Sequence, residues 1–324
     1  MRAPSDWPEA MPNTMNPTNA VEQLRVARQA RSPQRNQPAP RRMFLFSHPR
    51  LGASLPLAQD MARQMRAVGI TAEIVADKDA LTTQTFEPGD MVVALGGDGW
   101  MLQAGRITAE AGVPVLGVNL GRLGFLAEVQ PAEWRSVFDR VCAGDYWIEQ
   151  RMMLRTELWR GDQHLQSFDV LNEVVVSRGA VMRAVRLETH IDGGWLTTYV
   201  ADGLIIATPT GSTAYALAVG GPILPPELKN ILLIPVAPHL SMERAIVLAR
   251  GSTVTIIVHM EHEAVISGDG AIEHPLRDGD RMIIEAGPHS ARFVRTQDPS
   301  YFYRTLMERM GKNPAADMMK NPNA

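Results

Sequence analysis

Strands and helices alternate in the structure predicted for residues 43–143, because short apolar runs there are separated by stretches with helical periodicity. Ser54 is expected to cap the first helix and Gly69 to end it, whereas Pro131 begins the last helix and Gly144 follows it. This alternation is typical of an α/β domain, a parallel sheet covered by helices. The predicted strands are residues 43–46, 70–75, 91–95 and 113–118, and the predicted helices are residues 55–68, 100–111 and 131–143.

The pattern becomes β-rich near residue 145, where short apolar runs start to alternate with turn residues. Asp192-Gly193 and Asp278-Gly279 are predicted to form hairpin turns, and Asp269-Gly270 is predicted to form a turn. We expect a β-rich domain over residues 146–295, and then a segment, 296–324, whose amphipathic helix over 301–310 returns to the first domain. The predicted strands are residues 154–159, 172–176, 185–191, 204–207, 254–260, 281–285 and 293–295.

Residues 1–42 differ from both domains in composition. They hold seven of the 23 prolines, seven arginines, three acidic residues and few large apolar groups. Such a segment cannot bury enough apolar surface to offset the entropy lost on ordering. We therefore predict a disordered N-terminal tail over residues 1–42, followed by the α/β domain over residues 43–145.

The overall composition is that of an ordinary soluble chain of about two domains, with 324 residues of which 45% are apolar and 21% charged. A formal net charge of −3 argues against a general nucleic-acid binder. Cys142 is the only cysteine, which excludes an intrachain disulfide and a cysteine-rich zinc site and suits a reducing compartment. The chain shows no apolar signal core and no bilayer-length apolar run, so we expect a cytoplasmic protein that is neither secreted nor membrane-inserted.

Lysine is scarce: Lys78, Lys229, Lys312 and Lys320 are the four lysines among 32 basic residues, and the other 28 are arginines. None of the four stands beside a glycine-rich loop. This argues against the G-x-x-x-x-G-K-[ST] phosphate loop, the β3 lysine of protein kinases and Schiff-base chemistry. The G-x-G-x-x-G fingerprint is missing as well, which counts against a hydride-transfer enzyme.

A glycine-rich turn, Gly96-Gly97-Asp98-Gly99, follows the predicted strand 91–95, at the carboxyl edge where parallel sheets bind ligands. The glycines allow backbone N–H groups to approach phosphate oxygens. Asp98 is a candidate base that orients a hydroxyl group and takes its proton late in phosphoryl transfer. The alternative is a tight turn in which Asp98 only caps the following helix.

A second candidate region runs from Asp202 to Tyr215, from a strand through a turn rich in Thr, Ser and Gly into a short helix over 214–219. The exposed N–H groups of this turn form an anion or ligand site, and Tyr215 offers an aromatic face to a base. The alternative is an N-capped helix with Tyr215 in the core. The hydroxyl groups that can bond sugar or phosphate belong to Thr210, Ser212 and Thr213.

The third candidate is Asn172-Glu173, a polar pair that enters an apolar strand. Successive strand side chains face opposite ways, so one of the two faces a ligand unless a bulge or the strand end redirects both. Taken alone, the pair would be interpreted as an ordinary strand-edge pair.

In this order, the motifs closely resemble the NAD kinase family. They are Gly96-Gly97-Asp98-Gly99, the segment Gly-Val-Asn-Leu-Gly-Arg-Leu-Gly-Phe-Leu over residues 117–126, Asn172-Glu173 and the string from Asp202 to Pro222. Each motif is weak alone, whereas the ordered set is specific. The resemblance covers residues 92–285 and extends more thinly from Met43 to the terminal helix. It implies a Rossmann-like α/β domain without the G-x-G-x-x-G motif, then a β-rich dinucleotide-binding domain.

The reaction that the resemblance implies is transfer of the γ-phosphoryl group of ATP to the 2′-hydroxyl of the adenosine ribose of NAD, which yields NADP. A divalent metal ion, Mg²⁺ above all, is the implied cofactor. Because no lysine is available, the metal, backbone N–H groups and Arg side chains are expected to neutralise the phosphates. NAD and ATP are the implied small-molecule partners, and a homodimer or homotetramer is the implied assembly.

The match also assigns roles residue by residue. Asp98 resembles the family's proton acceptor, and Gly99 lies against the dinucleotide. Asn172 and Glu173 resemble the pair that binds the ribose and adenine region, and Asp202 resembles the carboxylate at the nicotinamide end. The remaining expected dinucleotide contacts are Thr213, Ala214, Tyr215 and Ala218 in the adenine pocket and Arg183, where the family often has a basic or His contact.

This chain departs from the family pattern at three positions. Trp100 stands where a small polar residue is common, and Ala218 stands where Ser is common, which removes a hydrogen bond to adenine. Val200 occupies a place that varies between members accepting oxidised and reduced dinucleotide. NAD and NADH both stay candidates, as do ATP and polyphosphate as donors.

Two rival functions share some of these features. A lipid kinase of the diacylglycerol or sphingosine type shares the Gly-Gly-Asp-Gly turn, but Asn172-Glu173 and the string from Thr210 to Tyr215 count against it. A non-catalytic dinucleotide-binding regulator would keep the pocket and lose the carboxylate at position 98, where Asp98 is present.

Overall fold

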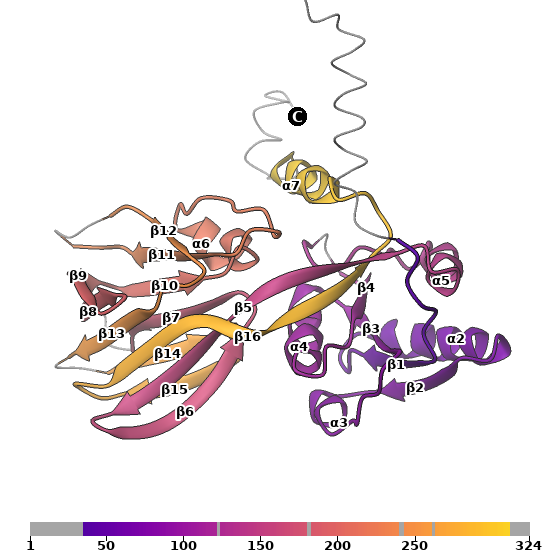
Figure 1. The fold of residues 1–324 in the computed structure, drawn as a ribbon, viewed down its shortest axis with the longest axis horizontal. Helices are drawn as coiled ribbons and strands as arrows, with labels where there is room; N and C mark the ends of the chain where they lie inside the picture. The colour runs from indigo at the N-terminus through magenta and orange to yellow at the C-terminus, as the bar shows by residue number, and fades with distance from the viewer. Residues whose placement is uncertain (1–34, 122–123, 180–182, 240–242, 261–262, 312–324) are drawn as a thin grey trace, which may run out of the picture. The chain divides into compact units, whose positions relative to one another are not determined.

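A parallel sheet forms the first half of the computed structural model, which describes residues 35–121, 124–179, 183–239, 243–260 and 263–311 (Figure 1). The elements of this half are β1 (Arg42–Ser47), α2 (Ser54–Ala67), β2 (Thr71–Val75), α3 (Lys78–Thr82), β3 (Asp90–Gly96), α4 (Asp98–Thr108), β4 (Val115–Asn119) and α5 (Trp134–Cys142). Its strands pair in parallel in the order β2-β1-β3-β4. The predicted α/β half is therefore confirmed.

Both faces of this sheet are buried, which explains why its strands are unbroken apolar runs. In β1, Met43 and Leu45 enter one hydrophobic cluster with α2 and α5, whereas Phe44 and Phe46 enter another with α4. All four side chains are fully buried. Helices therefore cover the sheet on both sides, and its carboxyl edge is left for the connecting turns.

The helix ends follow the prediction in part. Gly69 follows α2 with a φ of 84°, and Gly144 follows α5 with a φ of 75°, both in the left-handed region that glycine tolerates. The prediction that Ser54 caps α2 is wrong, because its hydroxyl accepts a hydrogen bond from the His48 N–H and donates one to the Leu95 carbonyl. Helix α5 begins at Trp134, whereas Pro131, its predicted first residue, lies in the turn before it.

The second half is a sandwich of two sheets. Its elements are β5 (Trp147–Arg160), β6 (Gln163–Val170), β7 (Glu173–Arg178), β8 (Val185–Ile191), β9 (Gly194–Ala201), β10 (Gly203–Ala207), a 3₁₀ turn (Gly211–Thr213), α6 (Tyr215–Ala218), β11 (Asn230–Val236), β12 (Ile246–Ala249), β13 (Val254–His259), β14 (Ala264–Gly268), β15 (Ile272–Leu276), β16 (Arg281–Arg295) and then helix α7 (Tyr301–Gly311). One sheet has the order β12-β11-β10-β7-β14-β15, and the other continues the parallel sheet as β4-β16-β13-β8-β9. Apolar side chains from both sheets share one core.

Strand β16 joins the two halves (Figure 1). Phe293 pairs with Val115 of β4, while Ile284 pairs with Val254 of β13. The predicted strands 281–285 and 293–295 are thus one strand, with an irregularity in its pairing to β5 between Ala286 and Ser290. The two predicted domains are continuous through this shared sheet.

The three predicted Asp-Gly turns have different outcomes. Asp192-Gly193 joins the paired strands β8 and β9, and Asp269-Gly270 joins β14 and β15; all four residues have positive φ. The Asp278-Gly279 hairpin is wrong. This turn connects β15 to β16, which belong to different sheets, so the chain crosses from one sheet to the other there.

Residues 35–41 contact the α/β half, which differs from the disordered tail predicted over residues 1–42. Arg35 forms an ion pair of 2.9 Å with Asp145, and the Tyr146 hydroxyl donates a hydrogen bond to the Pro38 carbonyl. Residue 42 already belongs to β1. The other predicted tail residues, 1–34, lie outside the described residues.

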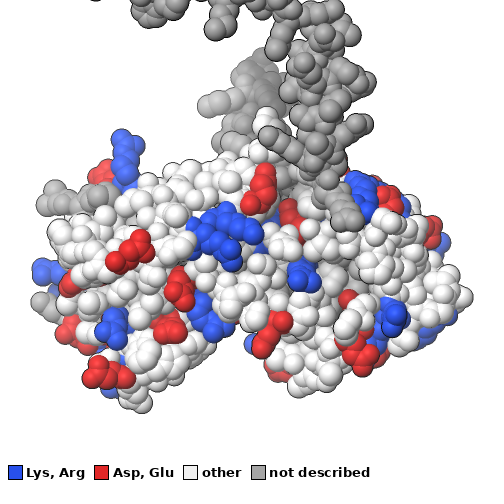
Figure 2. All heavy atoms as spheres, viewed as in Figure 1, with Lys and Arg blue, Asp and Glu red and all other residues white. Residues whose placement is uncertain are grey.

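The C-terminal segment also reaches the α/β half. The Thr296 N–H and hydroxyl both donate to the Glu128 carboxylate, and the Phe302 ring lies 5.9 Å from the Phe125 ring between centroids. No helix within the described ranges is long and apolar enough to cross a membrane. Acidic and basic side chains are interspersed over the face that Figure 2 shows.

Candidate active site

The Asp98 carboxylate lies at the start of α4 and points to a segment of the chain that follows β4. Its Oδ2 atom accepts a hydrogen bond of 2.6 Å from the Phe125 N–H, and its Oδ1 atom accepts one of 3.1 Å from the Leu126 N–H. Gly97 is the N-cap residue of α4, and no side chain bonds there. Asp98 therefore does not cap the helix, and these two backbone donors, with a longer hydrogen bond of 3.5 Å from the Ala127 N–H, orient its carboxylate instead.

Gly124 makes this arrangement possible. A Cβ atom at position 124 would overlap the Asp98 carboxylate, so only glycine lets the chain pass so close. The 117–126 segment singled out in the sequence thus holds Asp98 in place. Its residues Arg122 and Leu123 lie outside the described part of the chain.

The three glycines of the turn have different surroundings. A Cβ atom on Gly96 would overlap the Trp100 side chain, whereas one on Gly97 or Gly99 would meet no atom within 4 Å. Trp100 stacks on Phe46 with ring centroids 4.0 Å apart and donates to the Phe46 carbonyl. Gly96 is thus a packing requirement, and Gly97 and Gly99 leave open backbone that a ligand can approach.

A cavity of about 500 Å³ opens beside this backbone. Gly97 and Gly99 line it together with residues from the loop after β1, from α4 and from the β14–β15 turn. Two guanidinium groups and an imidazole stand among the lining side chains, which suits a polyanion. These three residues, which the sequence reasoning missed, are His48, Arg50 and Arg106.

Asp269 is a fourth residue that the sequence reasoning missed, since it was interpreted only as part of a turn. Its buried carboxylate accepts hydrogen bonds from the Asn172 N–H at 2.8 Å and the Glu173 N–H at 3.2 Å. Arg106 lies 3.9 Å away. Burial raises the pKa of Asp269, and the N–H donors and Arg106 oppose that rise. Asp269 thus connects the cavity to the Asn172-Glu173 pair.

Glu173 begins β7 and is buried, with 8% of the residue exposed. The Tyr215 N–H donates a hydrogen bond to this group, while its Oε2 atom has no partner. Burial, with a smaller contribution from Asp269, raises the pKa of Glu173 to about 8. At neutral pH it is mostly a neutral carboxylic acid, which can both donate and accept a hydrogen bond.

The Thr/Ser/Gly turn after β10 lies against this pair. The Thr208 N–H donates to the Asn172 carbonyl, and a Cβ atom on Gly211 would overlap the Asn172 backbone. Tyr215 is 43% exposed, so its ring is outside the core, and Ala216 is the buried residue of α6. The structure therefore brings Asn172, Glu173 and the turn together and leaves the Tyr215 ring open to a ligand.

Internal hydrogen bonds already occupy the three hydroxyl groups of the turn. Thr210 accepts from Arg151, and Thr213 donates to the Thr210 carbonyl. Ser212 donates to the Pro209 carbonyl and accepts from the Leu224 N–H. Their observed role is to shape the turn. Of the other expected adenine contacts, Ala214 is half-buried and Ala218 is exposed.

Asp202 lies at the other end of the site. Strand β10 pairs with β7 from Ala207 opposite Glu173 to Gly203 opposite Ser177, so Asp202 is five residues beyond Ala207, or roughly 17 Å at strand spacing. Its carboxylate forms an ion pair of 2.9 Å with Arg178.

Arg183 is placed near Asp202 rather than near Asn172, because Val185 pairs with Ala201 at the start of β8. It lines a separate cavity of about 390 Å³ together with Arg186, His259 and Asp278. Among the described residues, no group of three or more His, Cys, Asp or Glu side chains is placed to hold a metal ion.

Sequence comparison identifies the family of the chain. The ATP-NAD kinase N-terminal domain model matches residues 25–146, and the ATP-NAD kinase C-terminal domain model matches residues 171–296. The chain is 37% identical over 273 residues to the NAD kinase of Chloroflexus aggregans, which covers 84% of this chain and 99% of that protein. It is 42% identical over 217 residues to the NAD kinase of Geotalea daltonii, covering 67% and 76% of the two proteins.

Two solved structures share the fold. Yeast NADH kinase complexed with NADH superposes with a TM-score of 0.72 at 24% identity, covering 86% of this chain and 89% of that one. An NAD kinase from Archaeoglobus fulgidus in complex with ATP gives a TM-score of 0.67 at 22% identity, covering 83% and 98%. The predicted two-part fold is confirmed, and the sequence matches favour the NAD kinase prediction over the lipid kinase alternative. The chain belongs to the NAD kinase family.

Proposed function

We propose that the protein transfers the γ-phosphoryl group of ATP to the 2′-hydroxyl of the adenosine ribose of NAD, which yields NADP and ADP. One observation carries the proposal: Asp269 lines the cavity beside the glycine turn and also binds the backbone of Asn172-Glu173. A donor held in the cavity and an acceptor held by the pair would therefore meet at the Asp98 turn.

The donor side fits the polyphosphate chain of ATP. Arg50, Arg106 and His48 line the cavity, and Gly97 and Gly99 expose their backbone there. Guanidinium groups bind phosphate oxygens with paired hydrogen bonds, and backbone N–H groups add more donors. This set replaces the lysine that other phosphate-binding loops use.

The acceptor side fits the adenosine half of NAD. Glu173 has a buried oxygen without a partner, beside the exposed Tyr215 ring. A neutral carboxylic acid can accept a hydrogen bond from adenine or ribose and donate one in return, and an aromatic ring stacks on a base. We assign Asn172, Glu173 and residues 213–218 to this half, and Asp202 with Arg183 to the nicotinamide half.

Asp98 is the proposed proton acceptor. The 2′-oxygen forms a bond to the γ-phosphorus, the bond to the bridging oxygen breaks, and that oxygen leaves on ADP with the electron pair. The hydroxyl proton passes to the Asp98 carboxylate. Because the transition state is loose, the proton moves late, and a carboxylate fixed by the Phe125 and Leu126 N–H groups serves chiefly to orient the hydroxyl.

The side chains around the cavity are compatible with Mg²⁺ that arrives with the nucleotide. Kinase Mg²⁺ is held mainly by phosphate oxygens and water with one or two carboxylates, and the cationic lining of this cavity suits the phosphates. Asp269 lines the cavity, and Asp98 stands between Gly97 and Gly99 of the lining; backbone N–H groups engage both carboxylates, so either would contribute through its remaining lone pairs. Bound metal would neutralise charge on the transferring phosphoryl group.

The test is an assay of purified protein with ATP, Mg²⁺ and NAD, in which NADP should form. Asp98→Asn should lower turnover by about 10²-fold or more, the lower range for loss of a catalytic proton acceptor, while NAD binding is retained. Unchanged turnover would remove Asp98 from the mechanism. Parallel reactions with NADH and with polyphosphate would identify the preferred acceptor and donor.

A further inference from the structure

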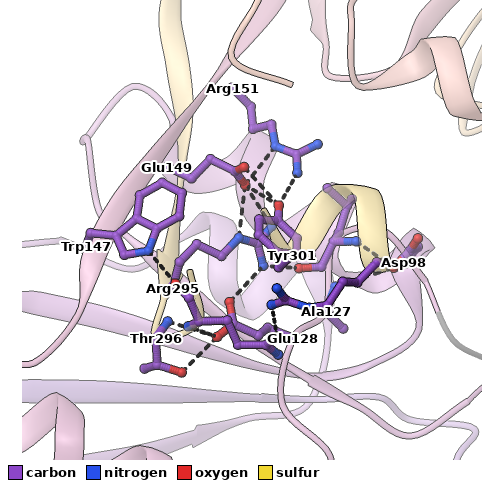
Figure 3. Close-up of polar contacts among 12 residues, drawn as sticks. Asp98, Ala127, Glu128, Trp147, Glu149, Arg151, Arg295, Thr296 and Tyr301 are labelled. Carbon is purple, nitrogen blue, oxygen red and sulfur yellow. Dashed lines mark hydrogen bonds and ion pairs between the residues drawn. The ribbon is translucent and has the colours of Figure 1, made fainter. Parts of the chain in front are cut away.

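A buried polar cluster joins β5, β16 and α7 (Figure 3). Glu149 accepts hydrogen bonds of 2.9 Å from Arg151 Nε and 2.8 Å from Arg295 Nη2. The Tyr301 hydroxyl donates to Glu149 and accepts a hydrogen bond of 2.8 Å from Arg151 Nη2. None of the four residues is more than 7% exposed. We call these four residues the Arg-Glu-Tyr cluster.

The charges within the cluster are nearly balanced. Two guanidinium groups face Glu149, and the buried Glu128 lies 3.9 Å from Arg295. Burying such groups costs solvation, and apolar side chains of the same volume would often stabilise a core as well or better. Stability alone therefore does not account for the cluster, whereas directional contacts to its surroundings would.

One end of the cluster reaches the Asp98 segment. Arg295 Nη1 donates a hydrogen bond of 2.7 Å to the Leu126 carbonyl. The N–H of the same residue, Leu126, donates to the Asp98 carboxylate. Figure 3 shows Asp98 next to this end of the cluster. Leu126 thus connects Arg295 to Asp98, the proposed proton acceptor.

The other end reaches the turn beside Asn172. Arg151 Nη1 donates a hydrogen bond of 3.2 Å to the Thr210 hydroxyl. The Thr210 carbonyl in turn accepts from the Thr213 hydroxyl at 3.0 Å, and Thr213 is one of the proposed adenine contacts. The cluster therefore touches both segments that the proposed reaction must align.

We propose that the Arg-Glu-Tyr cluster is a positioning device that fixes the Asp98 segment and the turn at residues 210–213 relative to each other. Tyr301 completes it from α7. None of the four side chains contacts substrate; they act through the Leu126 backbone and Thr210. This role rests on the proposed NAD kinase function and adds α7 to the machinery of the reaction.

The cluster keeps one protonation state across the pH range of enzyme assays. Burial would raise the pKa of Glu149, but the two guanidinium groups lower it to about 2. Burial raises the pKa of Tyr301 to about 12. The phenol therefore stays a donor to an ionised carboxylate, and a defect in the cluster should lower the rate equally at all pH values between these limits.

Tyr301→Phe is the direct test, with Tyr303→Phe as the matched control on the same helix, where the side chain is 51% exposed. We expect kcat to fall about tenfold in Tyr301→Phe, in the range that slight misplacement of reacting groups produces, with the KM for ATP changed less than about twofold. The pH profile should keep its shape. Tyr303→Phe should match the wild type.

Amide hydrogen exchange supplies a measurement that does not depend on turnover. In Tyr301→Phe, exchange should rise both at residues 125–127 and at residues 210–213, at temperatures where the protein stays folded. A rise spread over the whole chain would indicate simple destabilisation and would overturn the proposal, as would wild-type exchange in either segment.

Thr210→Val and Thr210→Ser form a second pair, since Ser retains the hydroxyl that Arg151 binds and Val does not. Val should reproduce the fall in kcat, and Ser should restore it. Equal rates in the two variants would also overturn the proposal. If the wild type makes no NADP, the proposed function fails, and the exchange experiment still decides whether the cluster couples the two segments.

Discussion

Replacing Glu173 by Gln should increase stability, and the gain should grow as the pH rises. The pKa of this carboxyl is about 8 in the folded protein, above the ordinary value of 4.5, so the folded state holds a proton that the unfolded state releases. The stability that this proton contributes is fully present below about pH 4.5 and is lost as the pH rises to about 8. Gln is neutral throughout and can still accept the hydrogen bond from the Tyr215 N–H.

The magnitude follows from the same shift. Between about pH 5 and about pH 8, the titration of Glu173 lowers the free energy of unfolding of the wild type by about 1.4 kcal/mol per pH unit, or about 4 kcal/mol in all. A rotation of Glu173 that brings its carboxylate to water would reduce this figure, so we expect a change of at least about 1 kcal/mol.

Urea unfolding of the wild type and of Glu173→Gln, each at about pH 5 and at about pH 8, measures this change in the free energy of unfolding. Glu285→Gln is the control, because Glu285 is exposed on β16. A wild-type-to-variant difference that stays constant within about 0.5 kcal/mol from about pH 5 to about pH 8 would refute the reasoning, as would a change of opposite sign.

Two further predictions concern substrate binding. Tyr215→Ala should raise the KM for NAD about tenfold and more than the KM for ATP, because stacking on a base contributes about 1–3 kcal/mol; the reverse order in steady-state kinetics would refute the adenine assignment. Arg50→Ala should raise the KM for ATP about tenfold and leave that for NAD unchanged, since a hydrogen bond to a charged group contributes about 1.5 kcal/mol or more. Arg63→Ala, exposed on α2 and outside the cavity, is the control, and equal effects of the two Arg variants would exclude Arg50 from the donor site.

Local patterns predicted most of the α/β half. The apolar run before Gly96 and the periodicity after Asp98 predicted a strand, a turn and a helix. In the β-rich half, β8 agrees with its predicted range, 185–191. Strands such as β6 were missed because their outer positions are polar and exposed, so little apolar alternation is left to detect. The Asp278-Gly279 hairpin failed for another reason: alternation shows which face of a strand is buried, but it does not reveal the neighbouring strand.

Parts of the candidate site could be predicted where its residues are close in sequence. Asn172-Glu173, the glycine turn and Tyr215 were found as motifs, and the structure brings Glu173 and Tyr215 together. Asp269 was missed because its partners lie 96 to 98 residues away along the chain. Arg50 follows β1 at the carboxyl edge of the parallel sheet, so the rule that ligands bind at that edge could have identified it.

Strand β16 has a consequence for how the protein is made. It is the last strand among the described residues, yet it lies in the middle of the larger sheet, between β4 and β13. During synthesis from the N-terminus, the backbone groups of β4 and β13 that pair with β16 therefore stay unpaired until residue 295 has left the ribosome. Nascent chains shorter than this should depend on chaperones, and neither half of the protein is expected to persist as a separate folded fragment.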